Sequence, residues 1–166
     1  ALGQITPSTT NKPRISYEPY GRVLLMEGAR TNLVLNSSIG TTQSITVTDV
    51  AHTLSFTGTG TVTLTGASTA GPLVGTGASD RVQLVFTPSA GSLTLTVSGD
   101  VRMEQCEAGS WRSSYIPTAG ATVTRAADTC TLAGTLFNLT QSAGTLYVRN
   151  RWDGGTATDA SNRTMI

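Results

Sequence analysis

The fold is decided by residues 44–66, SITVTDVAHTLSFTGTGTVTLTG, in which apolar and polar residues alternate with almost no interruption. The same alternation returns over residues 82–103, VQLVFTPSAGSLTLTVSGDVRM. Successive side chains of a β-strand point to opposite faces of the sheet, so a period of two predicts strands with one buried and one wet face. Glycine and proline interrupt the pattern at short intervals, which is typical of an all-β sandwich.

Six short strands are expected between Ser44 and Gln105, because the apolar residues form six alternating groups. These groups are Ile45 and Val47; Leu54 and Phe56; Val62 and Leu64; Val82, Leu84 and Phe86; Leu93, Leu95 and Val97; and Val101 and Met103. No segment keeps an apolar period of 3.6 residues over ten or more positions, so helices are expected to be few and short. The pattern therefore predicts an all-β fold built as an antiparallel β-sandwich.

Three regions are predicted along the chain. Residues 1–20 form an extended arm rich in Pro, Ser and Thr, because its prolines forbid a regular helix. Residues 21–118 form the sandwich. Residues 119–166 contain a linker and then two strands, Cys130–Leu139 and Gly144–Trp152. Two strands cannot build a core of their own, so they either join the first sandwich or begin a second, incomplete one.

Composition excludes several classes of function. Only 13% of the 166 residues are charged and the formal net charge is +1, so the chain lacks the basic surface that nucleic acid requires. No apolar run is long enough to span a bilayer, which argues against membrane insertion, and no segment resembles a signal peptide. The two cysteines, Cys106 and Cys130, are interpreted as buried thiols that act as small hydrophobes rather than as a disulfide.

Catalytic sets are not found. The single histidine, His52, excludes a histidine cluster for zinc and is interpreted as a surface or hydrogen-bonded residue. Sugar cleavage needs two facing carboxylates, but Glu104 and Glu107 fall on opposite faces of an extended strand. The aspartates stand at turn positions, and a structural calcium ion is only a minor alternative because no calcium-loop spacing is present. We therefore expect a protein that is not an enzyme and has no cofactor.

Sugar binding without cleavage needs an aromatic face for the apolar side of a sugar ring and planar hydrogen-bonding groups beside it. Trp111 and Arg112 supply both in the loop after Gly109, and Tyr115 follows in the same loop. These three are the candidate carbohydrate-binding residues. Two structural alternatives stay open: Trp111 could cap the sandwich or pack on the arm, and Tyr115 could anchor the outgoing chain by its ring with its hydroxyl in water.

The two ends of the predicted sandwich carry more specific motifs than its middle. The first end contains RISYEP at 14–19 and LLMEGARTNL at 24–33; the second contains VRMEQCEAGS at 101–110, SYIPT at 114–118 and VTRAAD at 123–128. Together they resemble the LLxEGARTNL and QLEAGxxxxSYIPTxGxxVTRAAD motifs of domains in structural proteins of tailed phages and prophages. The resemblance covers most of residues 14–128. Cys106 stands where that family usually has leucine, which favours a buried thiol.

The resemblance implies a jelly-roll sandwich like that of carbohydrate-binding modules, carried on a tail fibre, head fibre or other virion appendage. The segment 130–152 resembles the opening strands of a concanavalin- or laminin-G-like sandwich. The implied function is adhesion to host-surface carbohydrate. The alternatives are a purely structural module that decorates the virion or joins an appendage to it, and part of a polysaccharide depolymerase.

The same resemblance implies the partners and the location. The partners are host-surface polysaccharide, other virion proteins and further copies of the chain, with a trimer favoured by analogy. The protein is then part of a virion assembled in the bacterial cytoplasm. No sugar-contact motif is shared within the family, so the choice of Trp111, Arg112 and Tyr115 rests on their chemistry and position alone.

Overall fold

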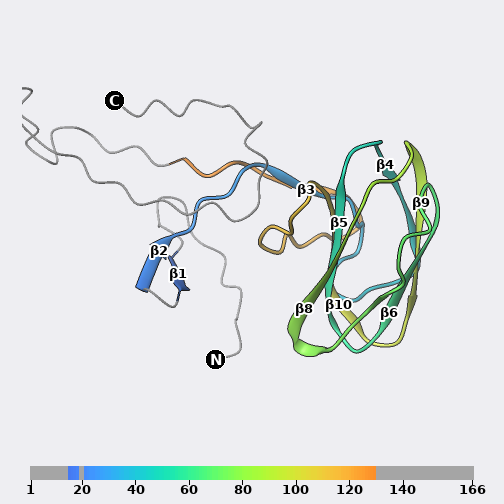
Figure 1. The fold of residues 1–166 in the computed structure, drawn as a ribbon, viewed down its shortest axis with the longest axis horizontal. Helices are drawn as coiled ribbons and strands as arrows, with labels where there is room; N and C mark the ends of the chain where they lie inside the picture. Colours follow the sequence, from blue (N-terminus) through green and yellow to red (C-terminus); the bar gives the residue numbers. More distant parts are fainter. Residues whose placement is uncertain (1–14, 19–20, 130–166) are drawn as a thin grey trace, which may run out of the picture.

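The computed structural model describes residues 15–18 and 21–129 of the chain (Figure 1). The described residues are strands and loops, and they include no helix that could cross a membrane. The strands are β1 (Ile15–Glu18), β2 (Gly21–Leu24), β3 (Arg30–Asn32), β4 (Gln43–Val47), β5 (His52–Gly58), β6 (Thr61–Gly66), β7 (Leu73–Val74), β8 (Gly77–Phe86), β9 (Gly91–Ser98), β10 (Val101–Ala108) and β11 (Val123–Arg125).

Two antiparallel sheets face each other and form the sandwich (Figure 1). One sheet has the strand order β10-β5-β8, and the other has the order β4-β9-β6-β7. From β4 to β10 the chain crosses from one sheet to the other after nearly every strand, β6 and β7 being the exception. The predicted all-β antiparallel sandwich is confirmed.

Strand β3 and the residues after it run along the free edge of β10. The Leu33 backbone N–H donates to the Cys106 carbonyl at 2.8 Å, and further along the Gly40 N–H donates to the Val101 carbonyl at 2.8 Å. With β3 beside β10, the two sheets read β3-β10-β5-β8 and β4-β9-β6-β7. This is the eight-strand order of a jelly roll.

The hydrophobic core lies between the two sheets. The six predicted apolar groups correspond to β4, β5, β6, β8, β9 and β10, and their inward positions supply most of the core. The buried core residues are Val34, Ile45, Val47, Leu54, Phe56, Val62, Leu64, Phe86, Leu93, Leu95, Val101 and Cys106. The prediction that Cys106 is a buried thiol is confirmed.

The outer face of β5 is not wet, contrary to the expectation from its alternating pattern. All seven residues of β5 are buried, including the outward-facing Thr53, Ser55 and Thr57. The loop after β10 covers this face: the Thr53 hydroxyl donates to the Gly109 carbonyl at 2.7 Å. Hydroxyl groups can be buried where neighbours satisfy their hydrogen bonds. The polar residues of β5 were therefore wrongly expected to face water.

A β-bulge interrupts β10. The pairing of β10 with β5 shifts between Arg102 and Gln105, and Met103 has a positive φ of 52°. Two residues of β10, Met103 and Glu104, therefore stand opposite one residue of β5. Met103 is only partly buried and lies outside the core cluster, so the prediction that it continues the apolar face of Val101 is wrong.

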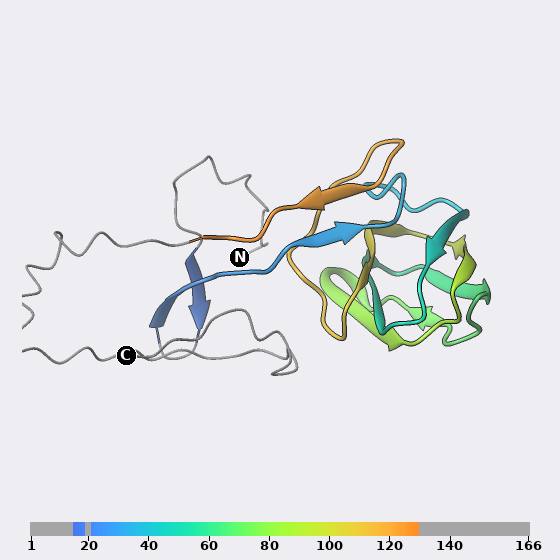
Figure 2. The same ribbon diagram turned by 90° about the horizontal axis from the view of Figure 1, so that it is seen from above.

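Two small pairings lie at the ends of the described chain. Strands β1 and β2 pair antiparallel, and β3 pairs antiparallel with β11, with Arg30 opposite Arg125 and Asn32 opposite Val123. Figure 2 shows β3 and β11 side by side at one end of the sandwich. Of the predicted arm, 15–18 are described. The strands predicted within 130–152 lie outside the described residues.

Candidate functional site

The incoming segment (residues 27–37) and the outgoing segment (residues 107–128) meet at one end of the sandwich, and Asn32 is the centre of this junction. Its Oδ1 accepts from the backbone N–H groups of Val34 at 3.1 Å and Cys106 at 3.2 Å. Its Nδ2 donates to the carbonyls of Glu104 at 3.2 Å and Ile116 at 2.9 Å. Asn32 is fully buried, and a primary amide can make two bonds of each kind, so its capacity is filled.

A second set of contacts joins the outer parts of the two segments. One Glu27 oxygen accepts from the Ser114 N–H at 2.7 Å, and the other accepts from the Arg125 guanidinium at 2.8 Å. One backbone bond also joins these segments, since the Asp128 N–H donates to the Glu27 carbonyl at 2.9 Å. The residues that carry the motif resemblance are therefore engaged mainly with one another.

A buried polar layer fixes the loop over the outer face of β5. The Glu107 carboxylate accepts from the Ser113 N–H at 2.6 Å and the Ser113 hydroxyl at 2.7 Å. The Arg81 guanidinium donates to the Ser113 carbonyl at 2.7 Å and the Ser55 hydroxyl at 2.9 Å. Burial lowers the pKa of Arg81 to about 10, against the opposing effect of Glu107. Arg81 therefore stays charged at neutral pH, and the loop is held by charge-assisted hydrogen bonds.

The three predicted sugar-binding residues have different surroundings on this loop. Trp111 is 51% exposed. Arg112 is exposed, and its guanidinium donates to the Arg81 carbonyl. Tyr115 is partly buried, and its hydroxyl is hydrogen-bonded to the Ser37 hydroxyl at 2.7 Å. The hydroxyl expected in water is thus bonded within the protein. Trp111 is the member of this set that offers a large aromatic surface to the outside.

The two glutamates of β10 are both fully buried. Glu107 belongs to the polar layer, whereas neither Glu104 oxygen has a hydrogen-bond partner in the described part of the chain. Burial raises the pKa of Glu104 to about 7. Burial raises the pKa of the neighbouring Cys106 thiol, and Glu104 and Glu107 raise it further. Cys130 lies outside the described residues. Residues 15–18 and 21–129 contain no group of three metal-ligating side chains.

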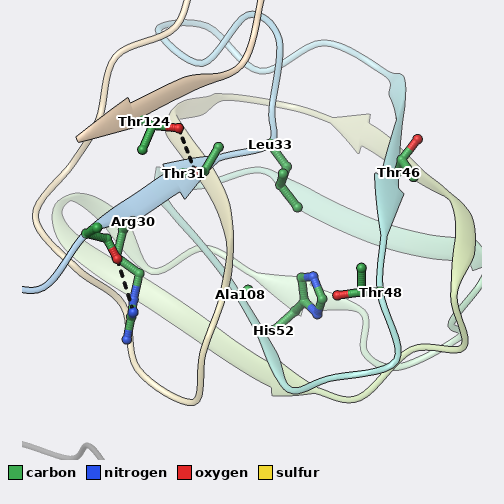
Figure 3. Close-up of a pocket in the computed structure, with 9 residues that line it drawn as sticks. Arg30, Thr31, Leu33, Thr46, Thr48, His52, Ala108 and Thr124 are labelled. Atoms are coloured by element: carbon green, nitrogen blue, oxygen red, sulfur yellow. Dashed lines mark hydrogen bonds between the residues drawn. The ribbon is translucent and has the colours of Figure 1, made fainter. Parts of the chain in front are cut away.

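An open cavity of about 390 Å³ lies at the junction (Figure 3). Its walls come from five strands: Arg30 and Thr31 of β3, Thr46 of β4, His52 of β5, Ala108 of β10 and Thr124 of β11. Sequence reasoning missed this cavity, because each residue is unremarkable in its own strand. His52 was expected to be a surface or a hydrogen-bonded residue; it is buried, and its Nδ1 lies 2.8 Å from the Val50 carbonyl.

None of the predicted residues Trp111, Arg112 and Tyr115 lines this cavity. The structure therefore presents two candidate surfaces near the junction: the exposed Trp111 on the outgoing loop and the cavity beside β3. No family model, curated protein or solved structure matches the chain. Function is accordingly inferred from the chemistry of these two surfaces and from the motifs.

The Asn32 hub makes a direct prediction. Asn32→Ala removes four hydrogen bonds and leaves buried backbone groups without partners, each at a cost of about 1–3 kcal/mol. We expect the free energy of unfolding, measured by urea denaturation, to fall by roughly 3 kcal/mol or more. Asn36→Ala is the matched control, because Asn36 is exposed and accepts one bond from the Gly120 N–H. Equal, small losses in both variants would contradict the role assigned to Asn32.

Glu104 makes the stability depend on pH. Its folded pKa of about 7 lies above the ordinary value of 4.5, so between these values the folded chain keeps a proton that the unfolded chain has lost. The Glu104 contribution to stability should therefore fall as pH rises from about 4.5 to about 7 and stay level above that. Glu104→Gln should remove this slope, whereas Asp49→Asn, at an exposed position, should keep it. Denaturation across this pH range in which Glu104→Gln keeps the wild-type slope would disprove the assignment.

Proposed function

We propose that this chain is a non-enzymatic module of a tailed-phage or prophage-like virion appendage that binds host-surface carbohydrate. The observation that carries the proposal is Trp111, a half-exposed indole on the loop after β10. Other residues of this loop are bonded to the buried polar layer beneath it. Ser113 is bonded to Glu107 and Arg81, so the loop is ordered before a ligand arrives. An aromatic side chain on a loop with a fixed backbone gives contact area to a sugar ring at little cost in loop ordering.

The motif residues support the appendage context. They pair the incoming and outgoing chain at β3 and β11, so the sandwich stands to one side of a two-stranded ribbon (Figure 2). Such a connection suits a module displayed from a fibre, because the chain reaches and leaves the sandwich at one place. The proposed partners are host-surface polysaccharide, other virion proteins and further copies of the chain in a trimer. The proposed location is the virion, with assembly in the bacterial cytoplasm.

Attachment within the virion is the second candidate function, and one surface favours it. Leu24 ends β2, Leu25 and Met26 follow it toward the sandwich, and the three are 46%, 36% and 47% exposed. Three consecutive exposed apolar side chains are suited to burial against another protein. In this alternative the module joins copies of itself, or joins an appendage to the virion, through residues 24–26.

Carbohydrate adhesion predicts adsorption that depends on surface polysaccharide. Purified protein should adsorb to host cells, and enzymatic removal of capsule or lipopolysaccharide sugars should abolish that adsorption. Trp111→Ala should weaken binding about tenfold or more, which corresponds to about 1.4 kcal/mol. Val85→Ala is the control, because Val85 is 45% exposed on β8 and its loss removes apolar surface elsewhere. Adsorption that survives complete stripping of the polysaccharide would contradict the proposal.

The attachment candidate predicts an assembly held by residues 24–26. Sedimentation equilibrium should show an oligomer for the wild type and a monomer for the double variant Leu25→Ser, Met26→Ser. Ile39→Ser is the control, since Ile39 is 66% exposed on a different segment. A wild-type chain that stays monomeric over the whole concentration range, or a double variant that assembles normally, would exclude this surface as the joint.

A further inference from the structure

The cavity at the junction carries an inference that rests on the proposed function and deepens it. Its volume of about 390 Å³ lies in the lower part of the range of roughly 300–1,000 Å³ that small-molecule sites occupy. That size suits a ligand no larger than one or two sugar rings. Figure 3 shows Leu33 and His52 reaching toward the space between the β3–β11 pair and the start of β5.

His52 gives the cavity a hydrogen-bond acceptor. A carbonyl oxygen can only accept, so the 2.8 Å contact with the Val50 carbonyl places a proton on Nδ1 of His52. In the neutral imidazole Nε2 is then an acceptor, and Nε2 makes no hydrogen bond with any residue of the described chain. The residue is only 1% exposed. An acceptor in this position is ready for a donor supplied by a ligand.

The other walls are apolar surfaces with hydroxyl groups. Leu33 and Ala108 contribute apolar surface, and Thr46 and Thr48 each combine a methyl group with a hydroxyl. The Thr31 and Thr124 hydroxyls are hydrogen-bonded to each other at 2.7 Å, which fixes the orientation of both side chains (Figure 3). The lining residues therefore carry both hydroxyl groups and apolar groups, the two kinds of surface that a sugar ring offers.

The charge of the cavity favours a neutral ligand. Arg30 is the cation of the lining, and its Nε lies 3.8 Å from the Glu107 carboxylate. The Arg30 Nη1 also donates to the Ala29 carbonyl at 3.2 Å. Because this guanidinium is already opposed by a carboxylate and engaged with the backbone, it provides no strong excess charge for an anion.

We propose that this cavity binds a single neutral sugar residue of the host-surface glycan. A sugar hydroxyl donates to Nε2 of His52, and the apolar side of the ring packs against Leu33 and the threonine methyl groups. Trp111, which is 51% exposed on the outgoing loop, then contacts a neighbouring part of the same glycan.

The experiment uses His52 as its reporter. The chain has one histidine, so the Cε1–H group of His52 gives a single NMR signal of its kind. The probes are neutral monosaccharides, titrated one at a time into the full chain, with glucuronate as the charged comparison. At least one neutral sugar should move the His52 signal in a saturable way, and glucuronate should move it less.

Two variants place the ligand without disturbing the buried histidine. Thr48→Trp fills the cavity from an exposed position and should abolish the shift, whereas Thr63→Trp makes the same change at an exposed position of β6 and should leave it intact. Failure of every neutral sugar to move the His52 signal would overturn the cavity proposal. If glycan binding were then lost in Trp111→Ala but not in Thr48→Trp, carbohydrate adhesion would stand and its site would be the loop. If no glycan bound at all, both proposals would fail.

Discussion

The structure depends on one buried amide. Asn32 stands between three segments that are far apart in sequence, with Glu104 and Ile116 lying 72 and 84 positions away. A buried amide without partners costs several kilocalories per mole in an apolar interior, so all four of its hydrogen-bonding positions must be satisfied together. They are satisfied only when β3 lies beside β10 and the outgoing loop lies over both. The amide therefore couples the docking of β3 on β10 to the docking of the outgoing loop.

Two consequences follow from that coupling. The loop covers the outer face of β5 and turns a face that would be wet into a buried polar layer around Glu107 and Arg81. Covering this face also fixes the backbone of Ser113, two residues after the exposed Trp111. On the other side of the junction, the β3–β11 pair forms one wall of the cavity that contains His52. Both candidate binding surfaces therefore depend on the same contacts.

Much of the fold could be predicted from local pattern, and the parts that could not share a physical cause. Apolar alternation predicts six strands, because each of them buries one face in the core. These are β4, β5, β6, β8, β9 and β10. Strands β3, β7 and β11 are two or three residues long and carry no such period. The bulge at Met103 escaped prediction, since alternation cannot show where pairing slips by one residue.

The site was predictable only in part, for a related reason. The residue types that suit sugar binding can be read from the loop, and Trp111, Arg112 and Tyr115 remain a prediction. The alternative for Tyr115 was an anchor of the outgoing chain by its ring, with its hydroxyl in water; the hydroxyl is bonded to Ser37 instead, so that part of the alternative is wrong. The cavity collects residues from five strands, so its chemistry exists only after folding. His52 was expected to be either a surface residue or a hydrogen-bonded one; it is buried and hydrogen-bonded, and a single histidine gave no indication of the cavity around it.

Native-state hydrogen exchange tests most directly whether the outgoing loop is part of the cooperative fold. The informative amides are those of Cys106, Ser113 and Ile116, which donate to the side chains of Asn32, Glu107 and Gln105. If the buried junction holds the fold together, the loop amides of Ser113 and Ile116 will exchange only on global unfolding, at the same free energy as the Cys106 amide in β10. Exchange of Ser113 and Ile116 at the rate of an open surface loop, with Cys106 still protected, would show that the loop is an independent cover and would contradict the central role given to Asn32.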